Sequence, residues 1–524
     1  MKRKIMAVTL TAAMLAGLAA VPVWADDTGS DEGKVLNIYC WNEEFKSRLT
    51  DHYPGYEEVD GTHGKIGDVD VVWNITPSDD NAYQNNLDET LLKQADASAD
   101  DKIDLFLVEA DYALKYVNTD YTMPVADLGI TEDEVADQYQ YTKDVMTDAD
   151  GNLKGLSWQG CPGTMIYRRD IAKEVFGTDD PAEVQKKVAD WDTFKATAEE
   201  LKEKGYQMTS TVNDSYRVFS NNVSTPWVVD GKITVDDNIK NWVDMSKEMV
   251  DAGETATYEL WSDDWSKGFF KDSNVFAYFG PAWFIDFSMS ADQDGSVGKD
   301  GGWAATEGPQ GFYWGGTWIT AATGTDNPTL VADIMRTMTT NVDVMKEIVT
   351  ADNDFVNNKP AMEEMAADES YGDAVLGGQN PLAMFCAGAD KIDLSNMSIY
   401  DQGCNEGIQT AFKDYFNGVI DLDTDTCTML VNRLCQFEKT RQVIIVVDTE
   451  LSGSVRTFRR IDAGIFYHNK SYTAFGSLFI IINMEETHFS TGFSVVRSHW
   501  SHHDTVLHCH TANCKRFKDM LILF

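Results

Sequence analysis

The sequence predicts an α/β protein with two or more domains, and three observations lead to this prediction. The chain has 524 residues, which is too long for a single compact core. Its hydrophobic fraction of 43% is high enough for extensive burial, so most of the chain should be ordered. Up to about residue 424, short apolar segments alternate with segments of helical periodicity, which is typical of βαβ units around a parallel sheet.

The first part of the chain is expected to form strands and helices in alternation. The strands are expected at residues 36–40, 69–74 and 103–108, and the helices at residues 43–52, 85–94 and 111–117. The third strand, IDLFLV, is short and continuously apolar, as in a sheet that is covered on both faces. This part should therefore form a parallel α/β sheet.

The later part of the chain continues in the same style. Helices are expected at residues 191–205, 239–253 and 330–349, and strands at residues 275–279 and 317–322. Between the two parts, DADGN at residues 148–152 resembles half of a calcium loop, but Met146 and Ser157 occupy the wrong positions for an EF-hand. We interpret Asp150 and Gly151 as a tight turn and keep a calcium loop as the alternative.

The net charge limits the partners of the protein. The formal charge is -42 at pH 7, and such an excess of acids argues against nucleic acids and anionic membrane surfaces as ligands. It suits a very soluble protein in an exposed compartment.

The first 25 residues resemble a secretory signal. Lys2, Arg3 and Lys4 precede an apolar segment at residues 5–21, and Val-Trp-Ala at residues 23–25 resembles a cleavage site. An uncleaved membrane anchor is the alternative, because the apolar segment is about long enough to span a bilayer. Residues 26–35 are expected to be a linker. We therefore expect export to the periplasm or the cell envelope.

The eight cysteines show no framework spacing in the body of the chain. Cys40, Cys161, Cys386 and Cys404 are expected to be small buried thiols. A bridge between Cys386 and Cys404 is the alternative outside the cell.

Residues 425–524 differ in composition from the rest of the chain. They hold 11 Lys and Arg against 9 Asp and Glu, whereas residues 1–424 hold 32 against 76. The segment also holds seven of the nine His and four of the eight Cys, several of them crowded between His499 and Cys514. We interpret this tail as atypical. It is an out-of-frame or misjoined translation, an unfamiliar genuine domain, or a domain with a zinc or copper site.

Aromatic and acidic side chains gather at the ends of the expected strands, where α/β sheets hold ligands. A flat indole can stack on the apolar face of a sugar ring, and carboxylates and amides can bond its hydroxyls. The candidate ligand-binding residues are Trp41, Asn42, Glu44, Glu109, Asp111, Trp158, Trp283, Asp286 and Trp314. For Glu43 the alternative role is to begin the following helix.

Other tryptophans are expected to pack in the core. Packing is favoured for Trp191, Trp242 and Trp303, because a Trp in a protein of this size is more often in the core than in a ligand site, and Trp318 inside a strand allows either role. For Trp41, Trp158, Trp283 and Trp314 ligand contact is favoured over packing, because they adjoin Gly, Pro or acids at strand ends.

Several segments in order resemble one known family. The segments include VLNIYCWNEEF, KIDLFLVEADYALKYV, LKGLSWQGCPGTMIYRRDIAKEVFG, WDTFKATAEELKEKG, VFAYFGPAWFIDF, FYWGGTWITAATGTDNPTLVADIM, DFVNNKP and YDQGCNEGIQTAFKDYFNG. Together they span about residues 36–424 and resemble bacterial extracellular solute-binding protein family 1, the carbohydrate-binding proteins of ABC importers. Many relatives are lipoproteins with a Cys after Leu-Ala-Gly, but here Leu18 follows Gly17, so a lipid anchor is not supported.

The resemblance implies a two-lobe periplasmic-binding-protein-like (type II) fold with a hinge and an interlobe cleft. Lobe 1 would comprise residues 36–155 and 312–350, and lobe 2 residues 156–311 and 351–424. The chain would cross between the lobes near residues 156–163, 309–316 and 352–359. The candidate residues would line the cleft, and the lobes would close over a carbohydrate ligand before docking on ABC transporter permease subunits. The resemblance also implies a monomer without a cofactor or metal.

Two rival functions remain open. A glycoside hydrolase could use Glu43 and Glu44, or Glu109 and Asp111, as its carboxylate pair. The sequence has no G-x-S-x-G motif, no P-loop and no Rossmann glycine pattern, and we therefore expect a non-catalytic protein. The other rival is a binding protein for a peptide or a polyamine, which would also need acids and aromatics.

Overall fold

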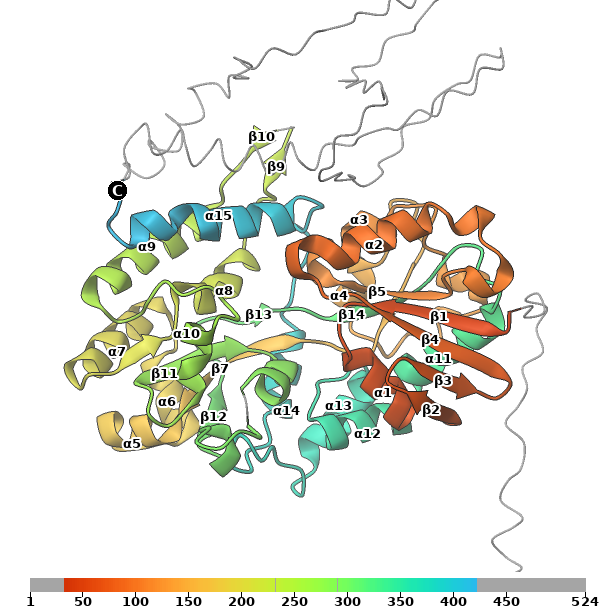
Figure 1. Ribbon diagram of the computed structural model, residues 1–524. Helices are drawn as coiled ribbons and strands as arrows, with labels where there is room; N and C mark the ends of the chain where they lie inside the picture. Colours follow the sequence, from red (N-terminus) through yellow and green to blue (C-terminus); the bar gives the residue numbers. More distant parts are fainter. Residues whose placement is uncertain (1–32, 231, 290, 422–524) are drawn as a thin grey trace, which may run out of the picture.

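The computed structural model describes residues 33–230, 232–289 and 291–421 of the chain. The expected signal segment and the atypical tail at residues 425–524 lie outside these residues, as does most of the expected linker. The described chain forms two lobes side by side, each built around its own β-sheet (Figure 1). The two-lobe α/β architecture expected from the sequence is confirmed.

The first lobe contains a mixed seven-stranded sheet in the order β2-β3-β4-β1-β5-β14-β6. Its strands are β1 (Val35–Cys40), β2 (Tyr56–Asp60), β3 (His63–Ile66), β4 (Val69–Ile75), β5 (Leu105–Glu109), β6 (Leu156–Ser157) and β14 (Thr317–Ala321). Only β1 pairs in parallel, with β4 on one side and β5 on the other, and the other pairs are antiparallel. The three strands expected in the first part of the chain, β1, β4 and β5, form a parallel unit as predicted. The antiparallel pairs of β2, β3, β6 and β14 were not predicted.

The hairpin of β2 and β3 explains part of that difference. The sequence of β2, YEEVD, consists mostly of acids, and four of its five residues are exposed. A strand that buries neither face has no apolar alternation, so the pattern predicts no strand there. By contrast, Leu105–Val108 of β5 are buried on both faces, as their continuous apolar run predicts.

Helices cover both faces of this sheet. They include α1 (Glu44–His52), α2 (Ala82–Leu91), α3 (Ala110–Val117), α4 (Gln140–Val145), α11 (Pro328–Thr340) and α12 (Val342–Asp352). The single helix expected at residues 330–349 is wrong, because it is interrupted at Asn341. The extended backbone of Asn341 lets its side-chain oxygen accept hydrogen bonds from the backbone N–H groups of Asp343 and Val344, which begins a new helix.

The second lobe contains a sheet in the order β12-β7-β11-β8, with β13 also paired to β7. Its strands are β7 (Pro162–Arg168), β8 (Gln207–Thr209), β11 (Val275–Gly280), β12 (Trp303–Thr306) and β13 (Phe312–Tyr313). The helices are α5 (Arg169–Phe176), α6 (Pro181–Lys187), α7 (Trp191–Glu203), α8 (Tyr216–Ser220), α9 (Asp237–Ala252), α10 (Asp263–Ser266), α13 (Lys359–Ala367), α14 (Leu382–Ala389) and α15 (Asp401–Phe416). A small hairpin of β9 (Val228–Val229) and β10 (Lys232–Ile233) projects beside α15 (Figure 1).

The segments that connect the lobes are hydrogen-bonded to one another. The chain leaves the first sheet after β6 and enters the second at β7, and it returns between β13 and β14. A further connection leads from α12 to α13. The backbone N–H of Gly160 donates to Phe355 at 2.9 Å, that of Asn357 to Trp158 at 2.7 Å, and that of Trp314 to Cys161 at 3.2 Å. These bonds tie the three connections into one narrow junction.

The three tryptophans that were expected to pack in the core do so. Trp242 and Trp303 are fully buried, and Trp191 is half-buried with its ring stacked on Phe219 at 4.2 Å. Trp318 is also buried, and its indole N–H donates to the carbonyl oxygen of Thr142. Trp318 therefore has a packing role in this structure.

Cys40, Cys161 and Cys404 are buried and Cys386 is half-buried, and no bridge joins Cys386 to Cys404. The alternative of a Cys386–Cys404 disulfide is therefore wrong for this structure. Within the described ranges, no helix combines the length and the apolar character that a membrane crossing requires.

Candidate ligand-binding site

Two of the predicted acids lie near the ends of neighbouring strands in the first lobe. Glu44 is the first residue of α1, shortly after β1, and Glu109 is the last residue of β5. Because β1 and β5 are parallel neighbours, their carboxyl ends open on the same edge of the sheet, as the sequence predicts. This edge faces the junction with the second lobe.

Glu44 shares one hydrogen-bond donor with a second carboxylate. The side-chain amide of Gln159 donates to Glu44 Oε1 at 2.6 Å and to Asp354 Oδ2 at 3.0 Å. Gln159 and Asp354 both belong to connections between the lobes. Burial raises the pKa of Glu44 to about 7, and the charge of Asp354 raises it further in the same direction. Glu44 therefore titrates near neutral pH, and its protonated form can donate as well as accept a hydrogen bond.

Arg48 lies behind this pair on α1. Its guanidinium bonds Asp352 at 2.7 Å and lies 3.8 Å from Asp354. The positive charge of Arg48 is therefore paired mainly with Asp352. It neutralises the negative charges of Glu44 and Asp354 only in part.

Glu109 and Asp111 form a second acidic group with a different arrangement. Glu109 caps α3, because its carboxylate accepts from the backbone N–H of Asp111 at 2.7 Å. Burial and the nearby charge of Asp111 raise the pKa of Glu109 to about 8. The carboxylate of Asp111 is bonded through both oxygens to the guanidinium of Arg217, with one contact at 2.6 Å. Arg217 belongs to α8 of the second lobe, so this ion pair joins the lobes.

Trp41 and Asn42 lie beside these acids. The half-buried Trp41 ring meets Tyr83 and Tyr112 edge to face, with centroid distances of 5.7 and 6.1 Å. The hydroxyl of Tyr112 is buried and finds no hydrogen-bond partner among the described residues. The side-chain oxygen of Asn42 accepts from the backbone N–H of Glu44 at 3.1 Å, so Asn42 fixes the turn that presents Glu44.

The second lobe contributes a cluster of indole rings. Trp283 follows β11, and its N–H donates to the carbonyl oxygen of Trp314 at 3.2 Å. The two rings meet edge to face at 5.4 Å. The Arg217 guanidinium lies 5.9 Å from the centre of the Trp314 ring, so the ion pair with Asp111 also borders this aromatic cluster. Sequence reasoning missed Arg217, whose partner is distant in the chain.

Trp261 completes the indole cluster and was also missed. Its ring lies 6.4 Å from that of Trp283 and 5.8 Å from that of Trp314. It precedes the short α10 and follows no strand, so the expectation that ligand groups lie at strand ends did not select it. The available signal was Trp261 itself, beside Asp263 and Asp264 in LWSDDW.

Cys161 lies on the connection from β6 to β7. Its backbone has a φ of +53°, in the left-handed region. Burial raises the pKa of its thiol, and the charges of Asp354, Glu44 and Glu109 act in the same direction. Acids that are far apart in the sequence thus act on one thiol at the junction.

Two further groups lie near this thiol. The Tyr313 hydroxyl is buried without a hydrogen-bond partner in the described part of the chain. A Cβ atom at Gly316 would lie 2.8 Å from that hydroxyl, and the φ of Gly316 is +97°, so the close approach and the backbone both require glycine.

Trp158 and Asp286 occupy other surroundings. Trp158 is fully buried and stacks on Phe45 at 5.2 Å, so in this conformation its ring belongs to the core. Asp286 is exposed, in the helical turn Phe284–Ser288, and its carboxylate interacts with Asn353. Ligand contact by the nine candidate residues stays a prediction.

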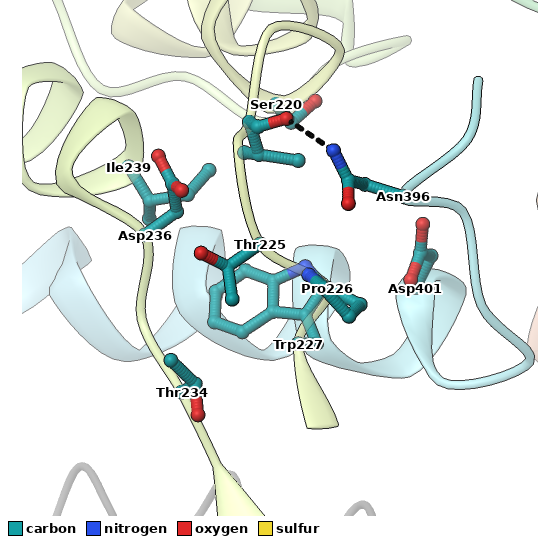
Figure 2. Close-up of a pocket in the computed structure, with 10 residues that line it drawn as sticks. Ser220, Thr225, Pro226, Trp227, Thr234, Asp236, Ile239, Asn396 and Asp401 are labelled. Carbon is teal, nitrogen blue, oxygen red and sulfur yellow. Dashed lines mark hydrogen bonds between the residues drawn. The ribbon is translucent and has the colours of Figure 1, made fainter. Parts of the chain in front are cut away.

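A small pocket lies apart from these residues, between the β9–β10 hairpin, α9 and α15 (Figure 2). Trp227, Asp236, Asn396 and Asp401 are among its lining residues. Their polar groups are already engaged: the Trp227 N–H donates to Asn405, Asp236 accepts from Ser224, Asn396 donates to Val223, and Asp401 accepts from Ser398. None of the nine candidate residues lines this pocket.

No group of three or more His, Cys, Asp or Glu in the described ranges is arranged to hold a metal ion. The His- and Cys-rich tail lies outside those ranges.

A family model supports the identification that the geometry suggests. The model for bacterial extracellular solute-binding proteins matches residues 62–375. The chain belongs to this family. A search of the curated proteins finds no match.

Solved structures share the fold of this solute-binding protein. An extracellular solute-binding protein of family 1 matches with a TM-score of 0.63 and 19% identity, over 77% of this chain and 99% of that chain. A binding protein from Bifidobacterium animalis subsp. lactis, in complex with β-1,6-galactobiose, matches with a TM-score of 0.55 and 16% identity, over 78% and 96%. The galacto-N-biose/lacto-N-biose I-binding protein of Bifidobacterium longum matches with a TM-score of 0.56 and 14% identity, over 79% and 99%.

Proposed function

We propose that this protein captures a sugar or short oligosaccharide between its lobes and delivers it to the permease of an ABC importer. The observation that carries the proposal is the opposition of two chemistries at the junction. Trp283 and Trp314 of the second lobe offer apolar ring surface, while Glu44 and Glu109 of the first offer hydrogen-bonding carboxyl groups. A sugar has both an apolar face and hydroxyls, so it matches both sides.

The raised pKa values of Glu44 and Glu109 suit a neutral ligand. A protonated carboxyl group has one donor and remaining acceptor capacity, which matches a sugar hydroxyl that also donates and accepts. The buried hydroxyls of Tyr112 and Tyr313 lack partners among the described residues. Ligand hydroxyls would satisfy them when the lobes close.

The proposed role is non-catalytic and extracytoplasmic. The narrow junction of three connections would act as the hinge, and the ligand would favour the closed state because only that state contacts it from both lobes. The two bifidobacterial neighbours were solved in complex with β-1,6-galactobiose and with lacto-N-biose, which supports a carbohydrate for this chain.

A polyamine is the second candidate, and the excess of acids favours it. Arg48 and Arg217 are bonded to Asp352 and Asp111, so Glu44, Asp354 and Glu109 have no full counter-charge within the junction. A cationic solute could supply that charge. Its affinity should rise steeply from pH 6 to pH 9 as the acids lose their protons, whereas sugar affinity should not.

Thermal-shift and calorimetric titrations test the proposal. The probes are galactose, β-1,6-galactobiose, lacto-N-biose, maltose, maltotriose, putrescine and spermidine. A melting shift with a sugar that is recovered intact supports a sugar receptor. Shifts with the amines alone support the second candidate, and turnover of a sugar contradicts the non-catalytic role. Trp283→Ala should weaken sugar binding strongly, whereas Trp73→Phe, at a buried indole that bonds Tyr56 in the first sheet, should not.

A further inference from the structure

Gln159 lies on the connection from β6 to β7 and is only 2% exposed. Its backbone N–H donates to the Ser157 hydroxyl at 3.0 Å, and the residue forms an antiparallel bridge with Val356 on the connection from α12 to α13. The next residue, Gly160, donates its backbone N–H to Phe355 at 2.9 Å. Gln159 is therefore fixed in a short ribbon that two of the interlobe connections form together.

The side-chain amide of Gln159 joins two carboxylates that are engaged to different degrees. It donates to Asp354 Oδ2 at 3.0 Å and to Glu44 Oε1 at 2.6 Å. Asp354 Oδ1 accepts from the backbone N–H of Phe355 at 2.9 Å, so both oxygens of Asp354 are bonded within the ribbon. Glu44 is half-buried, and its bond to Gln159 leaves Oε2 for a ligand. The amide thus orients the acid of this pair that still has an oxygen to offer.

These acids belong to a ring of contacts that closes through α1. Glu44 and Arg48 are four residues apart on this helix, so their side chains share a face. The Arg48 guanidinium bonds Asp352 at 2.7 Å, and the chain continues from Asp352 through Asn353 to Asp354. The ring consists of Glu44, Arg48, Asp352, Asn353, Asp354 and Gln159. Helix α1 is therefore held to the α12–α13 connection on both sides of Asn353.

Asn353 has a backbone geometry that suits a pivot. Its φ is +52°, in the left-handed region, and Cys161 on the β6–β7 connection has a φ of +53°. Non-glycine residues in this region are uncommon and recur at functional sites, and hinge motions change φ and ψ at a few residues of connecting segments. Rotation at Asn353 would move one side of the ring relative to the other, so it would strain or break the bond between Gln159 and Glu44.

We propose that Gln159 is a positioning residue that couples ligand contact at Glu44 to closure of the lobes. The inference rests on the proposed function, because it requires a ligand at Glu44, and it goes further by assigning the coupling to a buried side chain that need not touch the ligand. A ligand bonded to Oε2 stabilises the Glu44 orientation that completes the ring. The complete ring holds the connections as they are in this structure, in which Arg217 and Asp111 join the lobes. Since such coupling is reciprocal, closure raises ligand affinity by the same factor by which the ligand favours closure.

The experiment compares wild type with Gln159→Met, Gln159→Asn, Glu44→Ala, Gln94→Met and the double variant Glu44→Ala/Gln159→Met. Calorimetric titrations use β-1,6-galactobiose, lacto-N-biose, maltose and maltotriose, and small-angle X-ray scattering measures the radius of gyration with and without sugar. Gln159→Met keeps the length of the side chain but removes its donor. Gln159→Asn keeps an amide on a side chain that is one methylene too short for Glu44, and it provides the result if Gln159→Met disturbs folding.

Gln94 is the matched control. It is 5% exposed, and its amide bonds the backbone N–H of Ile103 at 2.9 Å and the carbonyl oxygen of the same residue at 2.7 Å. Ile103 precedes β5, whereas Glu109 ends it, so Gln94 lies at the other end of this strand. Gln94→Met therefore removes a buried amide of the same kind, and it should lower stability without changing sugar affinity or closure.

Gln159→Met and Gln159→Asn should each weaken sugar binding by about tenfold. The decrease in the radius of gyration on binding should also be smaller than in wild type. Glu44→Ala/Gln159→Met should bind within about twofold of Glu44→Ala, because Gln159 acts through the Glu44 carboxylate. A merely structural role predicts instead that the two losses of affinity multiply.

Three results would overturn the coupling while leaving the proposed function intact. The Gln159 variants could bind sugar as wild type does or lose no more affinity than Gln94→Met, the losses could multiply in the double variant, or affinity could fall while closure is unchanged. The last result would make Gln159 a simple ligand contact. If wild type binds none of these sugars, the proposed function fails and the coupling fails with it.

Discussion

The guanidinium of Arg217 is bonded through two nitrogens to both carboxylate oxygens of Asp111, and this ion pair joins the two lobes. Arg217 lies on α8 and Asp111 on α3, which flank different sheets. The side chains are only 20% and 23% exposed, so water screens the pair less than it would on the surface. The pair thus stabilises contact between the lobes in this conformation.

Asp111→Asn should lower the free energy of unfolding by about 1–3 kcal/mol, because it leaves the partly buried Arg217 without its counter-charge. It should also favour separation of the lobes, seen as a larger radius of gyration in small-angle X-ray scattering. Urea denaturation measures the first effect. Glu248→Gln is the control, because it removes an exposed pair with Lys195 and should cost less than about 0.5 kcal/mol. Equal effects of the two substitutions would contradict a stabilising interlobe pair.

Glu44 should make stability depend on pH. Its pKa is raised from an ordinary 4.5 to about 7, first by burial and then by the charge of Asp354. The folded state therefore binds a proton that the unfolded state has released. The stabilisation is fully present below about pH 4.5 and is lost as pH rises through about 7.

Glu44→Gln should flatten this dependence, so that its unfolding free energy, relative to wild type, increases between pH 5 and pH 8. Urea denaturation at a series of pH values gives the result. Glu43→Gln changes an exposed neighbour and should keep the wild-type profile. An unchanged profile in Glu44→Gln would show that other groups cause the dependence.

Asn341→Ala should destabilise the protein by about 1 kcal/mol, because the N-terminus of α12 would lose the side-chain oxygen that accepts from Asp343 and Val344. Asn341→Asp keeps an acceptor at the same position and should retain most of the stability. Chemical denaturation of the three proteins checks this. A similar loss in both variants would argue against the cap.

Gly316→Ala should lower the free energy of unfolding by about 1–3 kcal/mol and weaken ligand binding, because an added Cβ meets Tyr313 and the left-handed backbone disfavours alanine. Gly311→Ala is the matched control on the same connection, where an added Cβ has nothing within 4 Å. Thermal melts and ligand titrations measure both effects. If Gly311→Ala were the more harmful change, the close approach at Gly316 would not be the cause.

Elements with a strong local pattern agree with the sequence-based expectations. The helix expected at residues 239–253 corresponds to α9 (Asp237–Ala252), and the apolar run at residues 103–108 to β5. The sequence-based predictions fail where an element is fixed by hydrogen bonds rather than by a hydrophobic pattern. Both the exposed β2–β3 hairpin and the cap at Asn341 depend on hydrogen bonds, which leave no hydrophobic period.

The candidate site divides in the same way. The expectation that ligand groups follow strand ends selected Glu44 and Glu109, which lie near the carboxyl ends of β1 and β5, and Trp283, which follows β11 in the other sheet. Their contact with a ligand stays a prediction. That expectation missed Arg217, whose partner Asp111 is 106 residues away in the chain. It also missed Trp261, which lies in a turn rather than at a strand end.

The sequence by itself determined the alternating elements, the acidic and aromatic composition of the strand ends, and the family resemblance, because these depend on local spacing and residue type. The tertiary structure decided which acid shares Gln159, which arginine joins the lobes, and which indole stays exposed. Those outcomes depend on how the two lobes fold back through one junction, and contacts between distant segments leave no trace in local spacing.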